Sequence, residues 1–283
     1  MSIIYTDNLC DLDKEELKKY KVEQISFPLT FFGNTYRDFS EFDYFQFNQA
    51  LKTKEKIQID TITKDEFISS FKPSLEAGQD IIFIHGSAKL FSTTANLNNA
   101  IQELSIEFPN SKITTIDSYS VSIAEGNLVK EVARKNIEGA THDELVDFAK
   151  DTRKNITILF IADNIENLKA FNKIDSGSEL VGGVLGVKPI FSFDEVGRLS
   201  MIAKSSGKKK AILTISELVE KNGKNLFDYN LDIIENNSNI DAEALKSNLE
   251  NNIGKDLNIV IRKCNPIVSF FGGNSILGIS FRK

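Results

Sequence analysis

Residues 80–85 read Asp-Ile-Ile-Phe-Ile-His, and this run of consecutive apolar side chains indicates a strand that is buried on both faces. A helical pattern follows over residues 94–106, then another strand over residues 112–116 and a second helix over residues 121–136. Strands that alternate with helices favour an α/β fold built on a parallel sheet.

The same alternation extends upstream of this stretch. There we expect a strand over residues 2–5, an extended segment over residues 22–31, and helices over residues 13–20, 42–51 and 66–76. In the helix over residues 42–51, the spacing of Phe42, Phe45 and Ala50 predicts an apolar face. The first half of the chain therefore continues the α/β pattern.

Beyond residue 155 the pattern changes, because glycines cluster after the next strand and a hairpin follows them. The last expected element before this change is a helix over residues 142–153. After it we expect helices over residues 208–221 and 241–252 and strands over residues 156–162, 187–193, 228–234, 257–262 and 276–281. We therefore predict two domains. Residues 1–155 form an N-terminal α/β domain with a parallel sheet, and residues 156–283 form a C-terminal α/β domain with a mixed sheet.

Composition narrows the class of protein. The chain has 283 residues, of which 41% are hydrophobic and 26% charged, so a globular fold is expected. The net charge is −6, which gives no overall attraction to nucleic acid. Two cysteines exclude a disulfide framework. Without a signal-peptide pattern or a long apolar run, we expect a cytoplasmic protein with no stable membrane insertion.

The familiar motifs for cofactors and catalysis are absent. Residues 205–210 resemble a nucleotide-binding loop, but Ile202 stands where the first glycine is required. No Gly-x-Ser-x-Gly motif is present, so the usual hydrolase nucleophile is missing. His85 and His142 are the two histidines, and we expect His142 at the surface beside Thr141. No metal, cofactor or catalytic residue is predicted.

Four hydroxyl-rich loops remain, at residues 6–8, 60–63, 85–94 and 117–122. In a parallel sheet such loops gather at the carboxyl ends of the strands, where ligands bind. Hydroxyls and free backbone N–H groups at helix N-termini suit a small anion such as a carboxylate. The alternative is that each serine or threonine only caps a helix.

The order of short motifs along nearly the whole chain resembles the DegV family of bacterial fatty-acid-binding proteins. Residues 6–12 resemble the family's opening T-D-S-T-A-D-L, and residues 85–93 its H-I-S-S-x-L-S-G-T. Residues 116–122 are close to I-D-S-x-S-V-S, and residues 186–190 resemble N-I-K-P-I. The Phe27-Pro28-Leu29 segment resembles the family's V-P-L.

This resemblance implies a two-domain α/β fold with a ligand cleft that holds a long-chain fatty acid between the domains. The acyl chain would lie in an apolar tunnel, and hydroxyls of the first domain would hold the carboxylate. The positions that match are Thr61, Ser92 and Thr93, with Ser118 as a weaker candidate behind them. The family also implies that the bound acid is presented to a separate fatty acid kinase and that the binding protein has no active site.

The chain departs from the family pattern where arginine and histidine are expected to serve the kinase. Lys173 replaces an arginine, Ser206 replaces another, and Phe271 replaces a histidine. Lysine keeps the charge but loses the planar fork of arginine. Three hypotheses follow: a non-catalytic fatty-acid carrier, a working substrate-presenting subunit of a fatty acid kinase, or a scaffold that has lost its ligand. Entry of Phe91 into the head-group site would favour the scaffold.

Overall fold

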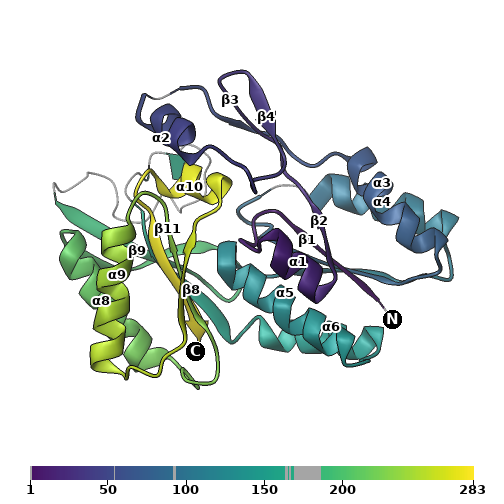
Figure 1. The fold of residues 1–283 in the computed structure, drawn as a ribbon. Helices are drawn as coiled ribbons and strands as arrows, with labels where there is room; N and C mark the ends of the chain where they lie inside the picture. Colours follow the sequence, from purple (N-terminus) through teal and green to yellow (C-terminus); the bar gives the residue numbers. More distant parts are fainter. Residues whose placement is uncertain (1, 54, 92–93, 163–164, 166, 169–185) are drawn as a thin grey trace. The chain divides into compact units, whose positions relative to one another are not determined.

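The computed structural model describes residues 2–53, 55–91, 94–162, 165, 167–168 and 186–283. The chain divides into two compact units, Met1–Lys154 and Asn155–Lys283 (Figure 1). Among the described residues, no helix is both long enough and apolar enough to cross a membrane.

The first unit is built on a four-stranded sheet in which every pairing is parallel. Its strands are β1 (Ile3–Asp7), β2 (Val22–Ile25), β6 (Ile81–His85) and β7 (Ile113–Asp117), in the order β2-β1-β6-β7. Every residue of the central strand β6 is buried. The prediction of a parallel sheet in the first half of the chain is confirmed.

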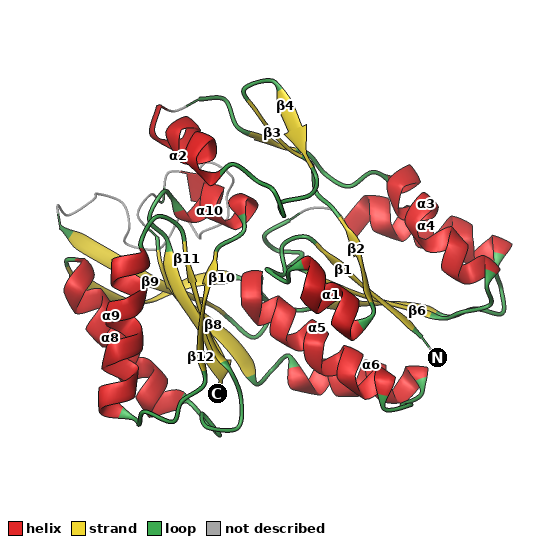
Figure 2. Cartoon of the chain, viewed as in Figure 1, coloured by secondary structure: helices red, strands yellow, loops and turns green. Residues whose placement is uncertain are grey.

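Helices cover both faces of this sheet (Figure 2). They are α1 (Lys14–Tyr20), α3 (Lys64–Glu76), α4 (Thr94–Glu107), α5 (Ser122–Ile137) and α6 (His142–Thr152). Helices α3 and α4 pack together, and α5 packs against α6 and α1. Local sequence starts three of these helices, because capping boxes pair Asp13 with Glu16, Thr63 with Glu66, and Thr141 with Glu144.

A small antiparallel sheet adds β3 (Leu29–Phe31), β4 (Asn34–Tyr36) and β5 (Gln58–Ile59). The extended segment predicted over residues 22–31 is thus two strands in two sheets. Pro28 lies between them and has no N–H to donate to a ladder. The turn from β3 to β4 uses positive φ values at Phe32 and Gly33, as a two-residue hairpin requires.

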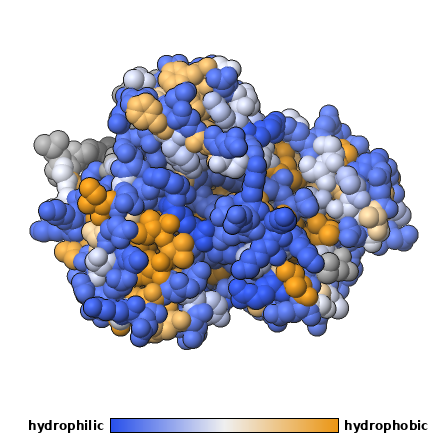
Figure 3. Space-filling view, in the orientation of Figure 1, coloured by the Kyte–Doolittle hydropathy of each residue, from blue (hydrophilic) through white to orange (hydrophobic). Residues whose placement is uncertain are grey.

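Helix α2 (Tyr44–Thr53) buries a different face from the predicted one. The side chain of Phe45 is 73% exposed, whereas Phe47 and Ala50 are buried. Phe42 is also buried, but it precedes the helix and its ring lies 5.7 Å from that of Phe31. Figure 3 accordingly shows apolar side chains exposed at the top of the view, over α2.

The second unit contains a six-stranded mixed sheet in the order β10-β9-β8-β13-β11-β12. The strands are β8 (Ile156–Ile161), β9 (Val187–Phe193), β10 (Leu199–Ser206), β11 (Leu231–Glu235), β12 (Ile259–Lys263) and β13 (Leu277–Arg282). Strands β11 and β12 pair in parallel, and the other pairings are antiparallel. Helices α8 (Lys208–Asn222) and α9 (Asn239–Asn252) pack on one another and on this sheet. The mixed sheet predicted for the second half is confirmed.

Helix α10 (Pro266–Gly272) was not predicted from the sequence. All seven of its residues are buried, so it has no polar face and no amphipathic period to detect. Its start does carry a local signal, because the Asn265 side chain caps the Ile267 N–H at 2.7 Å and Pro266 occupies the first turn.

Candidate functional site

Three loops meet at the carboxyl ends of β1, β6 and β7, and we call residues 7–12, 85–91 and 117–122 the three-loop cluster. Strands β1, β6 and β7 are neighbours, so these loops start side by side. Backbone hydrogen bonds then join two of them, from Ser87 N–H to Ser120 O at 2.7 Å and from Ser118 N–H to His85 O at 3.0 Å. The Gly86 N–H also donates to the Asp7 carboxylate at 2.9 Å, so all three loops are linked.

Asp117 and Arg153 hold the third loop. The carboxylate of Asp117 accepts the Tyr119 N–H at 2.8 Å and the Ala88 N–H at 3.2 Å. Arg153 donates to the Asp117 carbonyl at 2.7 Å, and its guanidinium carbon lies 3.9 Å from the centre of the Tyr119 ring. Tyr119 has a φ of 56°, an unfavourable value for a tyrosine. These contacts therefore fix a strained turn next to Ser118 and Ser120.

Asp7 and Glu125 form the buried acidic centre of the cluster. Asp7 accepts the Leu9 N–H and the Gly86 N–H, both at 2.9 Å, and Glu125 accepts the Thr6 hydroxyl at 3.1 Å. Burial raises the pKa of Glu125 well above its usual value, and the neighbouring charge of Asp7 raises it further. Burial also raises the pKa of Asp7, although its two N–H donors oppose that rise.

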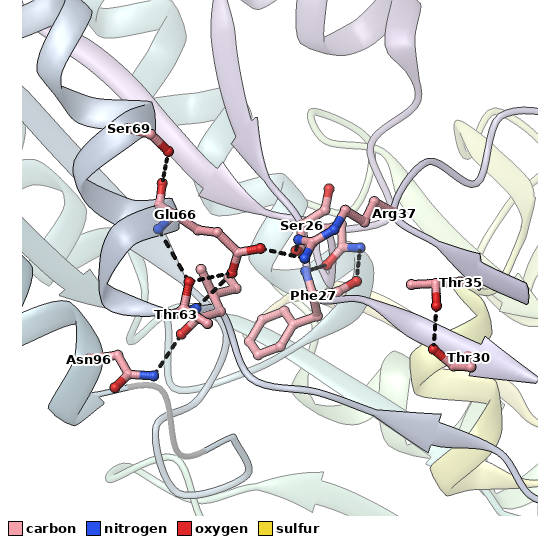
Figure 4. Close-up of polar contacts among 11 residues, drawn as sticks. Ser26, Phe27, Thr30, Thr35, Arg37, Thr63, Glu66, Ser69 and Asn96 are labelled. Carbon is pink, nitrogen blue, oxygen red and sulfur yellow. Dashed lines mark hydrogen bonds and ion pairs between the residues drawn. The ribbon is translucent and has the colours of Figure 1, made fainter.

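The fourth loop, residues 60–63, lies between β5 and α3 and reaches the first turn of α4. The side chain of Asn96 donates to the Ile62 carbonyl at 2.9 Å, and Thr63 caps α3 together with Glu66 (Figure 4). Arg37 pairs with Glu66 and donates to the Ser26 carbonyl at 3.0 Å. Thr61 is exposed within this held loop, so its hydroxyl is accessible to a ligand.

The four predicted site residues differ in placement. Ser118 is buried, and its hydroxyl donates to the Ser120 carbonyl at 3.1 Å within its own turn. Ser92 and Thr93 lie outside the described residues. Phe91 is buried against Phe27, with 5.5 Å between their ring centres.

Sequence reasoning did not single out Glu125 or Arg153. Glu125 lies in the stretch Ser122–Gly126 at the start of α5, and only the structure shows that this stretch is buried. Arg153 had no signal in the sequence, since it follows α6 and reaches Asp117 and Tyr119 only through the fold.

His142 is buried rather than at the surface as expected, with 8% of its area exposed. Its ring lies between the hydroxyls of Ser2, at 3.0 Å, and Thr114, at 2.8 Å. The first turn of α6 places it on the amino-terminal end of the sheet, opposite the three-loop cluster. Within the described parts of the chain, no group of three His, Cys, Asp or Glu side chains is placed to hold a metal ion.

The positions that depart from the family pattern lie in the second half of the chain. Ser206 is exposed at the end of β10, and Phe271 is buried in α10 beside Phe270, with 5.2 Å between ring centres. Lys208, two residues after Ser206, forms an ion pair with Asp241 at 2.8 Å and donates to the Ser275 carbonyl at 3.1 Å. Lys173 lies outside the described residues.

The fold and these loops define a two-unit α/β protein with a cluster of polar loops at the carboxyl ends of a parallel sheet. A family model described as an uncharacterised protein of the DegV family matches residues 2–283, so the chain belongs to the DegV family. The DegV domain-containing protein YteA of Lactococcus lactis is 28% identical over 220 residues, which cover 77% of this chain and 75% of that protein. A DegV domain-containing protein of Clostridium perfringens is 27% identical over 282 residues, which cover 99% of this chain and 98% of that protein.

Solved structures share the fold over the full length. A fatty acid binding DegV family protein from Streptococcus agalactiae superposes with a TM-score of 0.87 at 21% identity, covering 100% of this chain and 98% of that one. A fatty-acid-binding DegV family protein from Thermus thermophilus gives 0.85 at 18% identity, with 99% of both chains covered. The fatty acid kinase B3 protein of Streptococcus pneumoniae, loaded with linoleic acid, gives 0.84 at 17% identity, covering 100% of this chain and 99% of that one.

Proposed function

We propose that this protein is a non-catalytic carrier of a long-chain fatty acid. Hydroxyls among Thr61, Ser92, Thr93 and Ser118 hold the carboxylate, and the acyl chain lies in an apolar tunnel. The observation that carries the proposal is the three-loop cluster, in which the loop that leads to Ser92 is joined to the loop of Ser118 by backbone hydrogen bonds.

The energetics of such a ligand support this assignment. Burying about 15 methylenes at about 0.8 kcal/mol each contributes on the order of 12 kcal/mol before the costs of ordering. A carboxylate without hydrogen-bond donors would lose several kcal/mol of this. Thr61 is an exposed hydroxyl on a loop held by Asn96, so it can donate without the loss of an internal bond that Ser118 would incur.

The relatives support the same function. The Streptococcus agalactiae and Thermus thermophilus proteins are described as binding fatty acids, and the Streptococcus pneumoniae protein was loaded with linoleic acid. A ligand-free scaffold would be favoured if Phe91 filled the head-group site. Phe91 is buried with its ring centre 5.5 Å from that of Phe27, and Asn8 holds the backbone of Phe27.

Native mass spectrometry of protein purified without added lipid tests the carrier function. We expect a bound mass equal to that of a long-chain fatty acid, and uptake of labelled palmitate or oleate after delipidation. Protein that arrives empty and takes up neither label, with a melting temperature unchanged across a fatty-acid series, would favour the ligand-free scaffold.

Replacing single hydroxyls tests the head group. Thr61→Val is expected to weaken oleate binding by about ten- to a hundredfold, since a hydrogen bond to a charged group contributes roughly 1.5–3 kcal/mol. Thr35→Val is the matched control, because Thr35 is exposed on β4 and bonds only within its hairpin, to Thr30 at 2.8 Å. Wild-type affinity in Thr61→Val, Ser92→Ala, Thr93→Val and Ser118→Ala alike would exclude this head-group site.

A second candidate function is presentation of the bound acid to a separate fatty acid kinase. The likeness to the fatty acid kinase B3 protein favours it. The kinase would transfer a phosphoryl group from ATP to the fatty acid carboxylate, leaving ADP and an acyl phosphate. Acyl phosphate above a kinase-alone control would support this function. Ser206 is exposed, so an arginine at this position could reach a partner. More acyl phosphate with Ser206→Arg than with wild type would trace weak activity to the missing arginine.

A further inference from the structure

Glu125 is fully buried at the start of α5, beside the backbone of Gly86. A Cβ added to Gly86 would lie 3.1 Å from Glu125 Oε2, so the two groups are in close contact. Oε1 of Glu125 accepts the Thr6 hydroxyl, but Oε2 has no donor among the described residues. The Asp7 carboxyl borders the same groups: the Gly86 N–H donates to Asp7 Oδ2 at 2.9 Å, and Thr6, which donates to Glu125, directly precedes Asp7, so the two carboxyls are close neighbours.

One proton between the two carboxyls accounts for this arrangement. Both oxygens of Asp7 accept backbone N–H groups, from Leu9 and Gly86, which favours the negative charge on Asp7. A proton on Oε2 of Glu125 makes that oxygen a hydrogen-bond donor, and the Asp7 carboxylate has lone pairs left to accept from it. Two ionised carboxylates in this buried place would repel one another strongly.

The groups that surround Glu125 reinforce this assignment. Asp7 and Asp11, from the loop after β1, both act on Glu125 with negative charge. The buried thiol of Cys10 lies on the same loop, and burial and these acids raise its pKa. From β6, His85 acts on Asp7 and favours its charged form.

We propose that Glu125 and Asp7 share one proton and that this pair is a positioning element for the loop that begins at Gly86. The inference rests on the proposed function, because that loop leads to the predicted head-group residues. At alkaline pH, hydroxide removes the proton from Glu125 and forms water and a second carboxylate. The shared hydrogen bond is then lost, the two charges separate, and the Gly86 N–H loses its fixed acceptor. Oleate affinity falls as a result.

The pH profile of oleate affinity tests this role. The fatty acid titrates alike with both proteins, so a difference in pH dependence between wild type and Glu125→Gln comes from residue 125. We expect affinity to fall at least about tenfold in wild type and less than about twofold in Glu125→Gln, because an amide keeps the donor without titrating. Glu138→Gln, at the exposed C-terminal end of the same helix, is the matched control and should follow wild type. Equal pH slopes in wild type and Glu125→Gln would overturn the proposal.

Two measurements without lipid keep the proposal separate from the proposed function. Infrared spectra of wild-type protein should show a protonated-carboxyl band near neutral pH that is absent from Glu125→Gln and that disappears as the pH is raised. The Gly86 amide should exchange hydrogen at least about tenfold faster in wild type than in Glu125→Gln at the alkaline end, and equally fast at neutral pH. Absence of the band overturns the inference even if Glu125→Gln misfolds. With a folded variant, equal exchange throughout also overturns it, even if that variant binds normally. Wild type that shows both signals but binds no fatty acid refutes only the carrier function.

Discussion

The side chain of Asn8 makes two hydrogen bonds to the backbone of Phe27, accepting its N–H at 2.9 Å and donating to its carbonyl at 3.1 Å. Asn8 is buried and directly follows β1. It therefore ties the three-loop cluster to the segment that connects the parallel sheet with the small antiparallel sheet.

Replacing Asn8 by alanine should destabilise the protein by about 2–4 kcal/mol, because it leaves two backbone groups of Phe27 without partners. The urea midpoint of unfolding measures this loss. Thr35→Ala is a control, since it removes one hydroxyl of an exposed hydrogen-bonded pair and should lower the free energy of unfolding by less than about 0.5 kcal/mol. A similar midpoint for both variants would contradict the prediction.

Gly126→Ala should destabilise the protein, although alanine is the better helix former by about 1 kcal/mol. Gly126 lies in α5, where a Cβ would overlap the Cys10 carbonyl oxygen and contact Leu12. The backbone of the loop after β1 must move to make room for it. Thermal unfolding measures the sign, and a higher melting temperature for Gly126→Ala would show that the helix and the loop are not in close contact.

Arg153→Lys should lower stability by about 1 kcal/mol, because lysine cannot keep both the stacking on Tyr119 and the bond to the Asp117 carbonyl. We also expect weaker oleate binding, since the loop of Ser118 is no longer held. Arg134→Lys, on the exposed part of α5, provides the control in the same unfolding and binding measurements. If the two substitutions have equal effects, Arg153 does not position the loop.

His142 should make stability depend on pH below neutrality. Burial lowers the pKa of His142, so the folded protein favours the neutral ring while the unfolded chain takes up a proton near pH 6.5. The contribution of the neutral His142 ring to the free energy of unfolding is therefore complete above about pH 6.5 and is lost as the pH falls toward the folded-state pKa. The free energy of unfolding, measured from about pH 7 to pH 5, should fall more steeply in wild type than in His142→Gln. Parallel curves would show that His142 does not carry this dependence.

Short-range physics explains what could be read from the sequence. Apolar runs and helical spacing located β6, α4 and α5, because burial and backbone hydrogen bonding impose a period within a few residues. Periodicity failed for α10, because this helix is buried on all sides. It also placed Phe45 on the buried face of α2, because the predicted face counted Phe42 as helical whereas α2 begins at Tyr44. The joint order of motifs predicted the DegV family, which the match over residues 2–283 confirms.

The sequence by itself determined the alternation of strands and helices and the starts of three helices, because capping pairs such as Thr63 and Glu66 are three residues apart. Only the tertiary structure decided which polar groups meet. Thr6 and Glu125 are 119 residues apart, and Ser2 and His142 are 140 apart. Residues that distant along the chain become neighbours only when the parallel sheet forms, and their burial, which shifts the pKa of Glu125 and of His142, exists only in the packed fold.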